Sequence, residues 1–291
     1  MGLSRNRLKA LTGCSDESAG IFEAGRDWRI GRITCMEGVI RDGNIAIPSR
    51  LLMPDVPRGA AVLYAHAHGN AYGIGKAEAT EGRPALLDPP LGLWLAAQGH
   101  VVLCPDMPGF GERQEEGTEA ALSKAALWQG RPLLGVMLDD LARAGAALKV
   151  RPEVDPARIA VIGLSMGATL AYFHAALRPE IAACAHFCAF ADIAPLIATG
   201  AHDLHGSYMT VPGLLPAHDL GDVAALIAPR LQIVGVGLRD PLTPPAAFTP
   251  ALDRLRRAYA KSSDRLQVVV EPEGGHRESP AMRTALHDLF T

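Results

Sequence analysis

The sequence lacks the features that mark membrane proteins and nucleic-acid-binding proteins. No apolar stretch approaches the roughly 18 residues that a membrane-spanning helix needs. The 28 Lys and Arg residues nearly balance the 31 Asp and Glu residues, and no block of like charge occurs. A net charge of -3 gives no attraction to nucleic acid or to an anionic membrane. We therefore expect a soluble protein that binds a small molecule, with neither nucleic acid nor membrane among its partners.

Cysteine is scarce, and its spacing indicates neither disulfides nor a metal site. The five cysteines form no C-x-x-C pair, and an odd number in a chain of this size is typical of reduced thiols. The first residues also lack the apolar run of a secretory signal peptide. These absences predict a cytoplasmic protein. Cys104 and Cys188 are expected to be small buried apolar residues.

Nothing in the sequence divides the chain into parts, because it has no internal repeat and no linker rich in Pro, Gly or Ser. With 291 residues, 48% of them hydrophobic, the chain is long enough for one large core. We expect one domain over residues 1–291, in which residues 1–30 form an N-terminal extension without a recognisable pattern.

Short runs rich in Val, Ile and Leu alternate with longer segments of helical spacing. The runs are nearly continuous, as in strands buried on both faces, and cover residues 60–67, 100–106, 158–165, 182–190, 230–240 and 265–273. The helical segments cover residues 91–99, 132–150, 167–177, 245–262 and 278–290. This alternation predicts an α/β fold whose mostly parallel central sheet carries helices on both faces.

Residues 33–54 show a different pattern, in which two strand-like segments flank the pair Asp42-Gly43. This dipeptide favours positive φ angles and therefore a tight turn between antiparallel strands. We expect an antiparallel hairpin at the start of the sheet, with Pro48 weakening its second strand. In the parallel part, ligands bind beyond the carboxyl ends of the strands.

Two connecting segments, residues 69–91 and 192–229, are long for a compact domain. Residues 192–229 are expected to be either a lid over a pocket or a surface insertion. Within this segment Met209 and Leu214 are candidate pocket residues, together with His68 after an earlier strand.

Ser165 lies in the pattern Gly163-Leu164-Ser165-Met166-Gly167, between a predicted strand and a predicted helix. Glycines on both sides of the serine let the strand and the helix approach closely around a strained turn. Such a turn lifts the hydroxyl clear of the sheet, and it leaves the Met166 amide at a helix N-terminus, where it favours negative charge. The context predicts that Ser165 is a nucleophile.

A serine nucleophile requires a base and a group that orients the base. Asp240 follows the next-to-last predicted strand, and His276 follows the last one, after two glycines. The order Ser165, Asp240, His276 is that of one known arrangement of the catalytic triad. Asp192, which follows an earlier strand, is the alternative acid.

At this point the residues carry a resemblance to a known family. The segments "AHAHGN", "CPDMPGFGER", "GLSMG", "LRDPLTPP" and "GGH" resemble those of α/β-hydrolases, in particular the branch of dienelactone hydrolases and acetyl xylan esterases. The resemblance implies a serine hydrolase without a cofactor. It also implies an oxyanion hole formed by the backbone N–H groups of Asn70 and Met166. Because dienelactone hydrolases proper are expected to use cysteine where this chain has Ser165, ordinary carboxylic esters become the expected substrates.

Several other functions stay open at this level. Amide or peptide cleavage and C–C bond hydrolysis use the same three residues. A metal-dependent hydrolase would use histidines such as His66, His68, His202 and His205 to hold a zinc ion, although no suitably spaced carboxylate accompanies them. A binding protein without activity could also keep the fold. We expect no metal.

Some polar and aromatic residues have simpler interpretations. Glu112 and Arg113, in the loop that follows Asp106, are expected to pair with each other at the surface. Trp94, Trp128 and Tyr172 are expected to pack within helices of the core.

Overall fold

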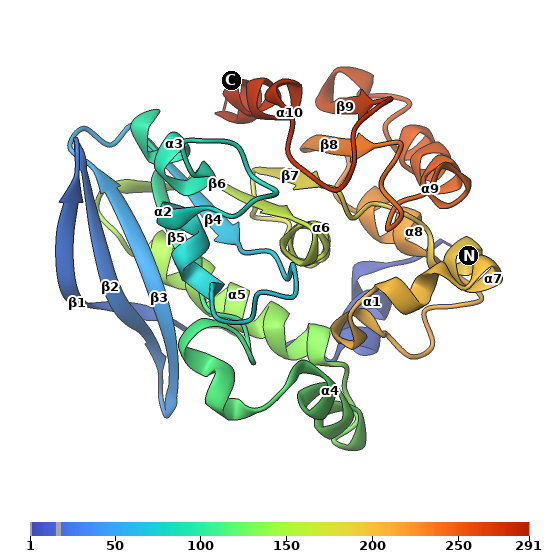
Figure 1. Cartoon of the computed structure of the whole chain (residues 1–291), viewed down its shortest axis with the longest axis horizontal. Coiled ribbons are helices and arrows are strands. Elements are labelled where there is room, and N and C mark those ends of the chain that lie inside the picture. The colour runs from blue at the N-terminus through green and yellow to red at the C-terminus, as the bar shows by residue number, and fades with distance from the viewer. Residues whose placement is uncertain (1, 16–18, 291) are drawn as a thin grey trace.

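The computed structural model describes residues 2–15 and 19–290, within which nine strands form one sheet in the order β1-β2-β3-β5-β4-β6-β7-β8-β9 (Figure 1). Strands β1, β2, β3 and β5 pair antiparallel, whereas β5, β4, β6, β7, β8 and β9 pair parallel. The strands are β1 (Ile21–Ile30), β2 (Ile33–Asp42), β3 (Ile45–Pro54), β4 (Gly59–Ala65), β5 (Val101–Pro105), β6 (Val154–Leu164), β7 (Ala183–Phe187), β8 (Leu231–Gly237) and β9 (Leu266–Glu271). The predicted mostly parallel sheet with an antiparallel start is confirmed.

The predicted hairpin is the pair β2 and β3, whose turn lies at Asp42-Gly43, with Gly43 at a φ of 57°. The segment expected to be an N-terminal extension instead contains a helix and a strand. Helix α1 (Arg5–Thr12) packs against the body of the protein, and β1 adds an antiparallel edge strand to the hairpin. In Figure 1, β1, β2 and β3 form one side of the molecule. The single-domain organisation stays a prediction, supported by this continuous sheet.

The continuous apolar strands serve two cores at once, because successive side chains of a strand point to opposite faces. In β4, Leu63 packs in one core and its neighbour Tyr64 in the other. In β6, Val161 and Ile162 divide in the same way. The sheet is therefore the middle layer of three, as expected from strands without polar alternation.

Helices cover both faces of the sheet and thereby confirm the predicted layers. Residues of α1, α5, α6, α8 and α9 pack in the first core, and residues of α2, α3 and α10 pack in the second. Besides α1, the helices are α2 (Glu78–Glu81), α3 (Leu91–Ala97), α4 (Glu119–Trp128), α5 (Leu133–Lys149), α6 (Met166–Leu177), α7 (Ile193–Thr199), α8 (Leu220–Ala225), α9 (Pro245–Ala258) and α10 (Pro280–Ala285).

The expectations for single core residues hold in part. Tyr172 is fully buried, Trp94 is partly buried against the second core, and Cys104 and Cys188 are buried as predicted. The prediction for Trp128 is wrong, since this residue ends α4 at the surface and is 91% exposed. None of the helices in residues 2–15 and 19–290 is both long enough and apolar enough to span a bilayer.

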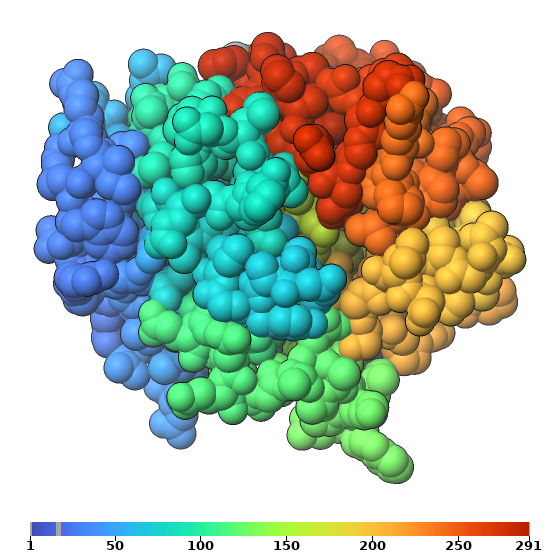
Figure 2. All heavy atoms as spheres, in the orientation of Figure 1, coloured from blue at the N-terminus to red at the C-terminus, as the bar shows by residue number. Residues whose placement is uncertain are grey.

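The carboxyl ends of the parallel strands lead into loops that surround a hollow. Figure 2 shows this hollow between the cyan segment that follows β4 and the orange and red segments near the C-terminus. Yellow-green atoms, the colour of β6 and α6, lie at its floor. This is the edge of the sheet at which Ser165, Asp240 and His276 were expected.

Candidate active site

Ser165 is the single residue between the end of β6 and the start of α6. Its φ of 58° and ψ of -123° lie in a region that residues with a side chain rarely adopt, which marks the strained turn predicted from the sequence. The turn is fixed by hydrogen bonds, since the Ser165 amide donates to the Phe187 carbonyl at 2.9 Å. Its own carbonyl accepts from the amides of Ala168 and Thr169.

The two glycines of the pattern are required by close backbone contacts. A Cβ atom on Gly163 would lie 2.1 Å from the carbonyl carbon of Gly167. A Cβ atom on Gly167 would lie 1.9 Å from the carbonyl oxygen of Ala65 in β4. No side chain fits at either distance, so both positions need glycine for α6 to pass this close to β4 and β6.

His276 and Asp240 form a hydrogen-bonded pair. Asp240 follows β8 and is 1% exposed, and His276 follows the neighbouring strand β9. Nδ1 of His276 lies 2.7 Å from Oδ2 of Asp240, while Oδ1 of Asp240 accepts the Leu242 amide at 2.9 Å. Because a carboxylate only accepts hydrogen bonds, Nδ1 donates, and Nε2 of the imidazole is left to act as a base.

Ser165 and His276 line the same cavity, which has a volume of about 600 Å³. Its walls come from the loop after β4, from the start of α4 and from residues 203–208, and include His68, Asn70, Glu119, Ser207 and Tyr208. Within the described ranges no hydrogen bond joins Ser165 Oγ to the imidazole. Hydrogen bonds between a catalytic nucleophile and its base are often long in free enzymes and tighten only in the complex with substrate. The structure thus brings the three predicted residues to one edge of the sheet.

Comparisons with known proteins agree with this arrangement. Residues 91–205 match the model of the Dienelactone hydrolase family. The Bacillus subtilis (strain 168) protein named "Putative hydrolase YtaP" is 34% identical over 245 residues, which are 83% of this chain and 82% of that protein. The chain belongs to the dienelactone hydrolase family.

Two solved structures resemble this dienelactone hydrolase family member in fold over nearly its whole chain. Acetyl Xylan Esterase 1 from Thermoanaerobacterium sp. JW/SL YS485 has a TM-score of 0.64 at 16% identity, covering 98% of this chain and 91% of that chain. A glucuronoyl esterase from Solibacter usitatus has a TM-score of 0.67 at 12% identity, covering 98% and 90%. The predicted α/β-hydrolase fold is therefore confirmed, and the family is one of hydrolases.

Asp192, the alternative acid, makes contacts that hold parts of the fold together. It is buried, its Oδ1 accepts the Gly221 amide at 2.9 Å, and its Oδ2 pairs with Arg254. Asp192 thereby joins the end of the β7 loop to α8 and α9. Both carboxylate oxygens are engaged away from His276.

The amides expected to form the oxyanion hole differ in their surroundings. Met166 is the first residue of α6, where a backbone N–H has no acceptor within the helix. The Asn70 amide, in contrast, already donates to Nδ1 of His68 at 3.0 Å. Asn70 has a φ of 52° and follows Gly69, whose φ is 54°, so a tight turn of two left-handed residues borders the cavity.

The four histidines considered as metal ligands do not converge on one point. Three of them contact other protein groups, and the fourth lies at the surface. His66 is buried, accepts the Met107 amide on Nε2 at 3.1 Å, and has a pKa lowered by burial. His205 contacts the Leu242 carbonyl through Nε2 at 3.0 Å, and burial lowers its pKa too. His68 contacts Glu119, and His202 lies at the surface of a neighbouring cavity. In the part of the chain that the structure describes, no three His, Cys, Asp or Glu residues gather as a metal site would require.

The pocket residues expected from the sequence separate into two cavities. His68 lines the cavity of Ser165. Met209 and Leu214 instead line a neighbouring cavity of about 400 Å³, among apolar residues such as Ile193 and Ile197. Residues 203, 205, 206 and 207 line both cavities and form the wall between them. Met209 and Leu214, which were expected as pocket residues together with His68, therefore line a different cavity from that of Ser165.

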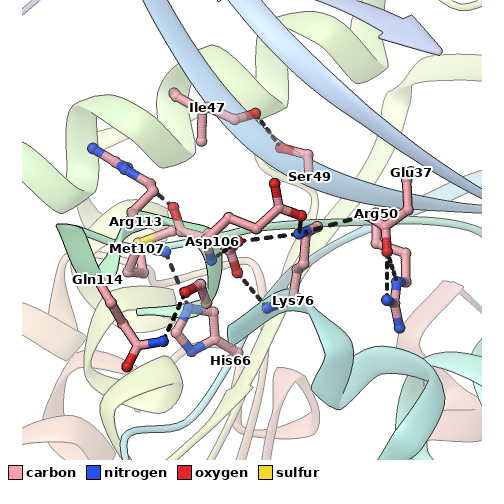
Figure 3. A network of polar contacts seen from close by, with 12 residues as sticks. Glu37, Ile47, Ser49, Arg50, His66, Lys76, Asp106, Met107, Arg113 and Gln114 are labelled. Atoms are coloured by element: carbon pink, nitrogen blue, oxygen red, sulfur yellow. Dashed lines mark hydrogen bonds and ion pairs between the residues drawn. The ribbon is translucent and has the colours of Figure 1, made fainter. Parts of the chain in front are cut away.

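The expected surface pair of Glu112 and Arg113 is wrong. Glu112 contacts the buried Lys76 at 2.5 Å, and Arg113 contacts Asp140 at 2.7 Å. Figure 3 shows Lys76 between Asp106 and the pair Glu37 and Arg50. Asp106 accepts from the Lys76 amide at 2.6 Å and from Lys76 Nζ at 3.2 Å. This buried network fixes the loop after β4, from which His68 and Asn70 enter the cavity.

Sequence reasoning did not find Glu119, the most extensively bonded carboxylate in this cavity. Glu119 is the first residue of α4, a helix that was predicted only through Trp128 at its other end and without bounds. One local signal was present, because Thr118 before it can cap a helix and its side chain accepts the Ala121 amide at 3.3 Å. The partners of Glu119 are distant in sequence, so no spacing could reveal them.

Proposed function

We propose that this protein is a serine esterase, which hydrolyses carboxylic esters through an acyl-enzyme formed on Ser165. The observation that carries the proposal is one cavity lined by a serine in a strained strand-to-helix turn and by a histidine whose Nδ1 is held by a buried aspartate. Each of these features serves nucleophilic catalysis, because the turn exposes the serine hydroxyl and the aspartate orients the histidine that acts as its base.

The reaction proceeds in two halves. Nε2 of His276 takes the proton of Ser165 as Oγ bonds to the carbonyl carbon of the ester. The bond from this carbon to the alcohol oxygen then breaks, and the alcohol leaves with the proton from His276. Water next attacks the acyl-enzyme and gives a proton to His276. The acid departs, and the proton returns to Ser165 Oγ.

Asp240 holds the imidazole with its proton on Nδ1 and stabilises the charged imidazolium that each step creates. The Met166 amide, at the N-terminus of α6, donates to the oxygen that becomes negative in the tetrahedral intermediate. The Asn70 amide, which Nδ1 of His68 holds in place, is the second donor and shares its hydrogen between that nitrogen and the substrate oxygen.

The class of substrate follows from the cavity and from the relatives. A volume of about 600 Å³ accommodates a small-molecule ester. Two structural neighbours are named acetyl xylan esterase and glucuronoyl esterase, which supports ester hydrolysis over amide or C–C bond hydrolysis.

The test compares the wild-type protein with Ser165→Ala and with Ser263→Ala, an exposed serine away from the cavity. Short p-nitrophenyl esters, matched amides and acetylated sugars are assayed, and a fluorophosphonate probe is located by mass spectrometry. We expect ester hydrolysis and labelling of Ser165 in the wild type and in Ser263→Ala, and neither in Ser165→Ala. Ester hydrolysis that persists in Ser165→Ala would reject the proposal, and sensitivity of that residual activity to a chelator would favour the metal-dependent alternative.

A further inference from the structure

Glu119 connects two walls of the cavity through one carboxylate. Oε2 lies 2.5 Å from Nε2 of His68, in the loop after β4. Oε1 accepts the Ser207 hydroxyl at 2.9 Å and the Tyr208 amide at 2.8 Å, both in the segment between α7 and α8. Glu119 is 5% exposed although it lines the cavity.

We propose that Glu119 is a positioning residue, which fixes the proton of His68 on Nε2 and thereby holds the Gly69-Asn70 turn beside Ser165. This inference rests on the proposed esterase function for its kinetic consequence, but its structural part can be tested without activity.

The position of the His68 proton follows from the charge of Glu119. Burial would raise the pKa of this carboxyl, but hydrogen bonds from His68, Tyr208 and Ser207 outweigh burial and lower the pKa. Glu119 is therefore ionised at neutral pH and can only accept. Nε2 of His68 must carry the proton, and Nδ1 is left as an acceptor for the Asn70 amide at 3.0 Å.

The Asn70 amide belongs to a turn that needs such support. Gly69 and Asn70 both have positive φ angles, and for Asn70 this conformation costs free energy. Both residues line the cavity with Ser165. A loss of the His68 acceptor would release the turn and displace backbone groups next to the nucleophile.

The contact of Oε1 with Tyr208 determines how the side-chain amide of a glutamine at position 119 would be oriented. The Tyr208 amide is a backbone donor and cannot become an acceptor, so the side-chain oxygen of a glutamine must stay on Tyr208. Its NH₂ group then faces Nε2 of His68. An imidazole can adapt by moving its proton to Nδ1, where the proton opposes the Asn70 N–H.

The packing at residue 206 supports a fixed position for this carboxylate. A Cβ atom on Gly206 would lie 2.8 Å from Oε1 of Glu119. Glycine at this position lets the chain approach the carboxylate closely enough for the Ser207 and Tyr208 contacts. The wall of residues 203–208 and the turn of residues 69–70 are thus held by the same group.

The direct test is the proton position on His68, read from the ¹⁵N chemical shifts of its imidazole. We expect Nε2 protonated in the wild type and Nδ1 protonated in Glu119→Gln. The matched control is Glu115→Gln, which removes the same charge from an exposed residue whose carboxylate makes no hydrogen bond or ion pair with the rest of the described chain. We expect the wild-type tautomer there. A wild-type His68 protonated on Nδ1 would overturn the proposal, even if Glu119→Gln failed to fold.

The kinetic test measures kcat and KM separately. We expect kcat to fall by about tenfold or more in Glu119→Gln, as for the loss of alignment of an oxyanion donor, with little change in KM. Ser207→Ala removes one contact of Oε1 but not the ionised carboxylate, and it should keep the His68 tautomer of the wild type. An unchanged kcat in a Glu119→Gln protein whose tautomer has switched would reject the positioning role.

Failure of this inference is distinguishable from failure of the proposed function. If Ser165→Ala kept full activity, the esterase proposal would fail whatever the tautomer of His68. If Ser165 were labelled by the fluorophosphonate and its alanine variant were inactive, but Glu119→Gln matched Glu115→Gln in tautomer and kcat, only the inference on Glu119 would fail.

Discussion

Nδ1 of His276 lies 2.7 Å from Oδ2 of Asp240, and the two residues follow neighbouring parallel strands, β9 and β8. Close backbone contact brings them together, since a Cβ atom on Gly237, at the end of β8, would lie 2.4 Å from the Gly274 carbonyl oxygen. The Arg239 amide also donates to that carbonyl at 2.9 Å. The sheet and its glycines thus position the imidazole before any substrate arrives.

Asp240→Asn should nearly abolish ester hydrolysis while leaving the fold intact. Oδ1 of Asp240 accepts the Leu242 amide, a donor that cannot change its role, so the NH₂ group of an asparagine would face Nδ1 of His276. The imidazole would then carry its proton on Nε2 and could not accept the serine proton. We expect kcat to fall by about 10⁴-fold. The exposed Asp264→Asn is the control, and a kcat close to wild type in Asp240→Asn would contradict the assignment.

Asp192→Asn should lower the stability of the protein but not its catalytic rate, the opposite of what is expected for Asp240→Asn. The change weakens the buried pair with Arg254 while the Gly221 amide keeps its acceptor. We expect the free energy of unfolding to fall by about 1–3 kcal/mol, with kcat of the folded protein unchanged. Urea denaturation and esterase assays on the same preparations measure both quantities. A large loss of kcat without loss of stability would restore Asp192 as the catalytic acid.

Two glycine-to-alanine changes should alter stability in opposite directions. At Gly167 the new Cβ would lie 1.9 Å from the Ala65 carbonyl, so the backbone must move, and we expect a loss of more than about 3 kcal/mol or no soluble protein. At Gly145, inside α5, the nearest atoms are 3.9 Å and 4.0 Å away. Alanine there should add about 0.5–1 kcal/mol, because it lowers the entropy of the unfolded chain. Equal thermal stability of the two variants would refute this interpretation of the turn.

The sequence predicts those parts of the fold that follow from local chemistry. Continuous apolar runs indicated the parallel strands, Asp42-Gly43 indicated a turn, and Gly163 and Gly167 indicated the strained serine. Strand β1 was missed because its side chains are mostly exposed, Ile21 by 64%, so it lacks the apolar run that marks the other strands, and it joins the sheet by pairing with β2.

The chemistry around the cavity was less accessible to sequence reasoning. Glu119 contacts His68 and Tyr208, which lie 51 and 89 residues away, and no local pattern encodes such contacts. Met209 and Leu214 were placed in the correct segment but face the neighbouring apolar cavity. Which side of a wall a side chain occupies depends on the path of the whole loop, and hydrophobicity alone does not determine that path.

Histidines buried without a charged partner should make the protein less stable in mild acid. Burial lowers the pKa of His174 in α6 to about 3 and the pKa of His186 in β7 to about 3. In the unfolded chain a histidine has a pKa of about 6.5. Between these values the unfolded state binds a proton that the folded state does not bind, so each histidine favours unfolding as the pH falls.

His174→Leu isolates one of these contributions. The stabilising effect of the neutral form is fully present above about pH 6.5 and is lost as the pH falls toward 3, at up to about 1.4 kcal/mol per pH unit. The free energy of unfolding, measured in urea from pH 7 to pH 4, should therefore decline less steeply in His174→Leu than in the wild type. Carboxylates protonate equally in both proteins, so the difference in slope reports this histidine. Parallel curves would mean that His174 takes up its proton inside the folded protein, and the burial argument for this residue would be wrong.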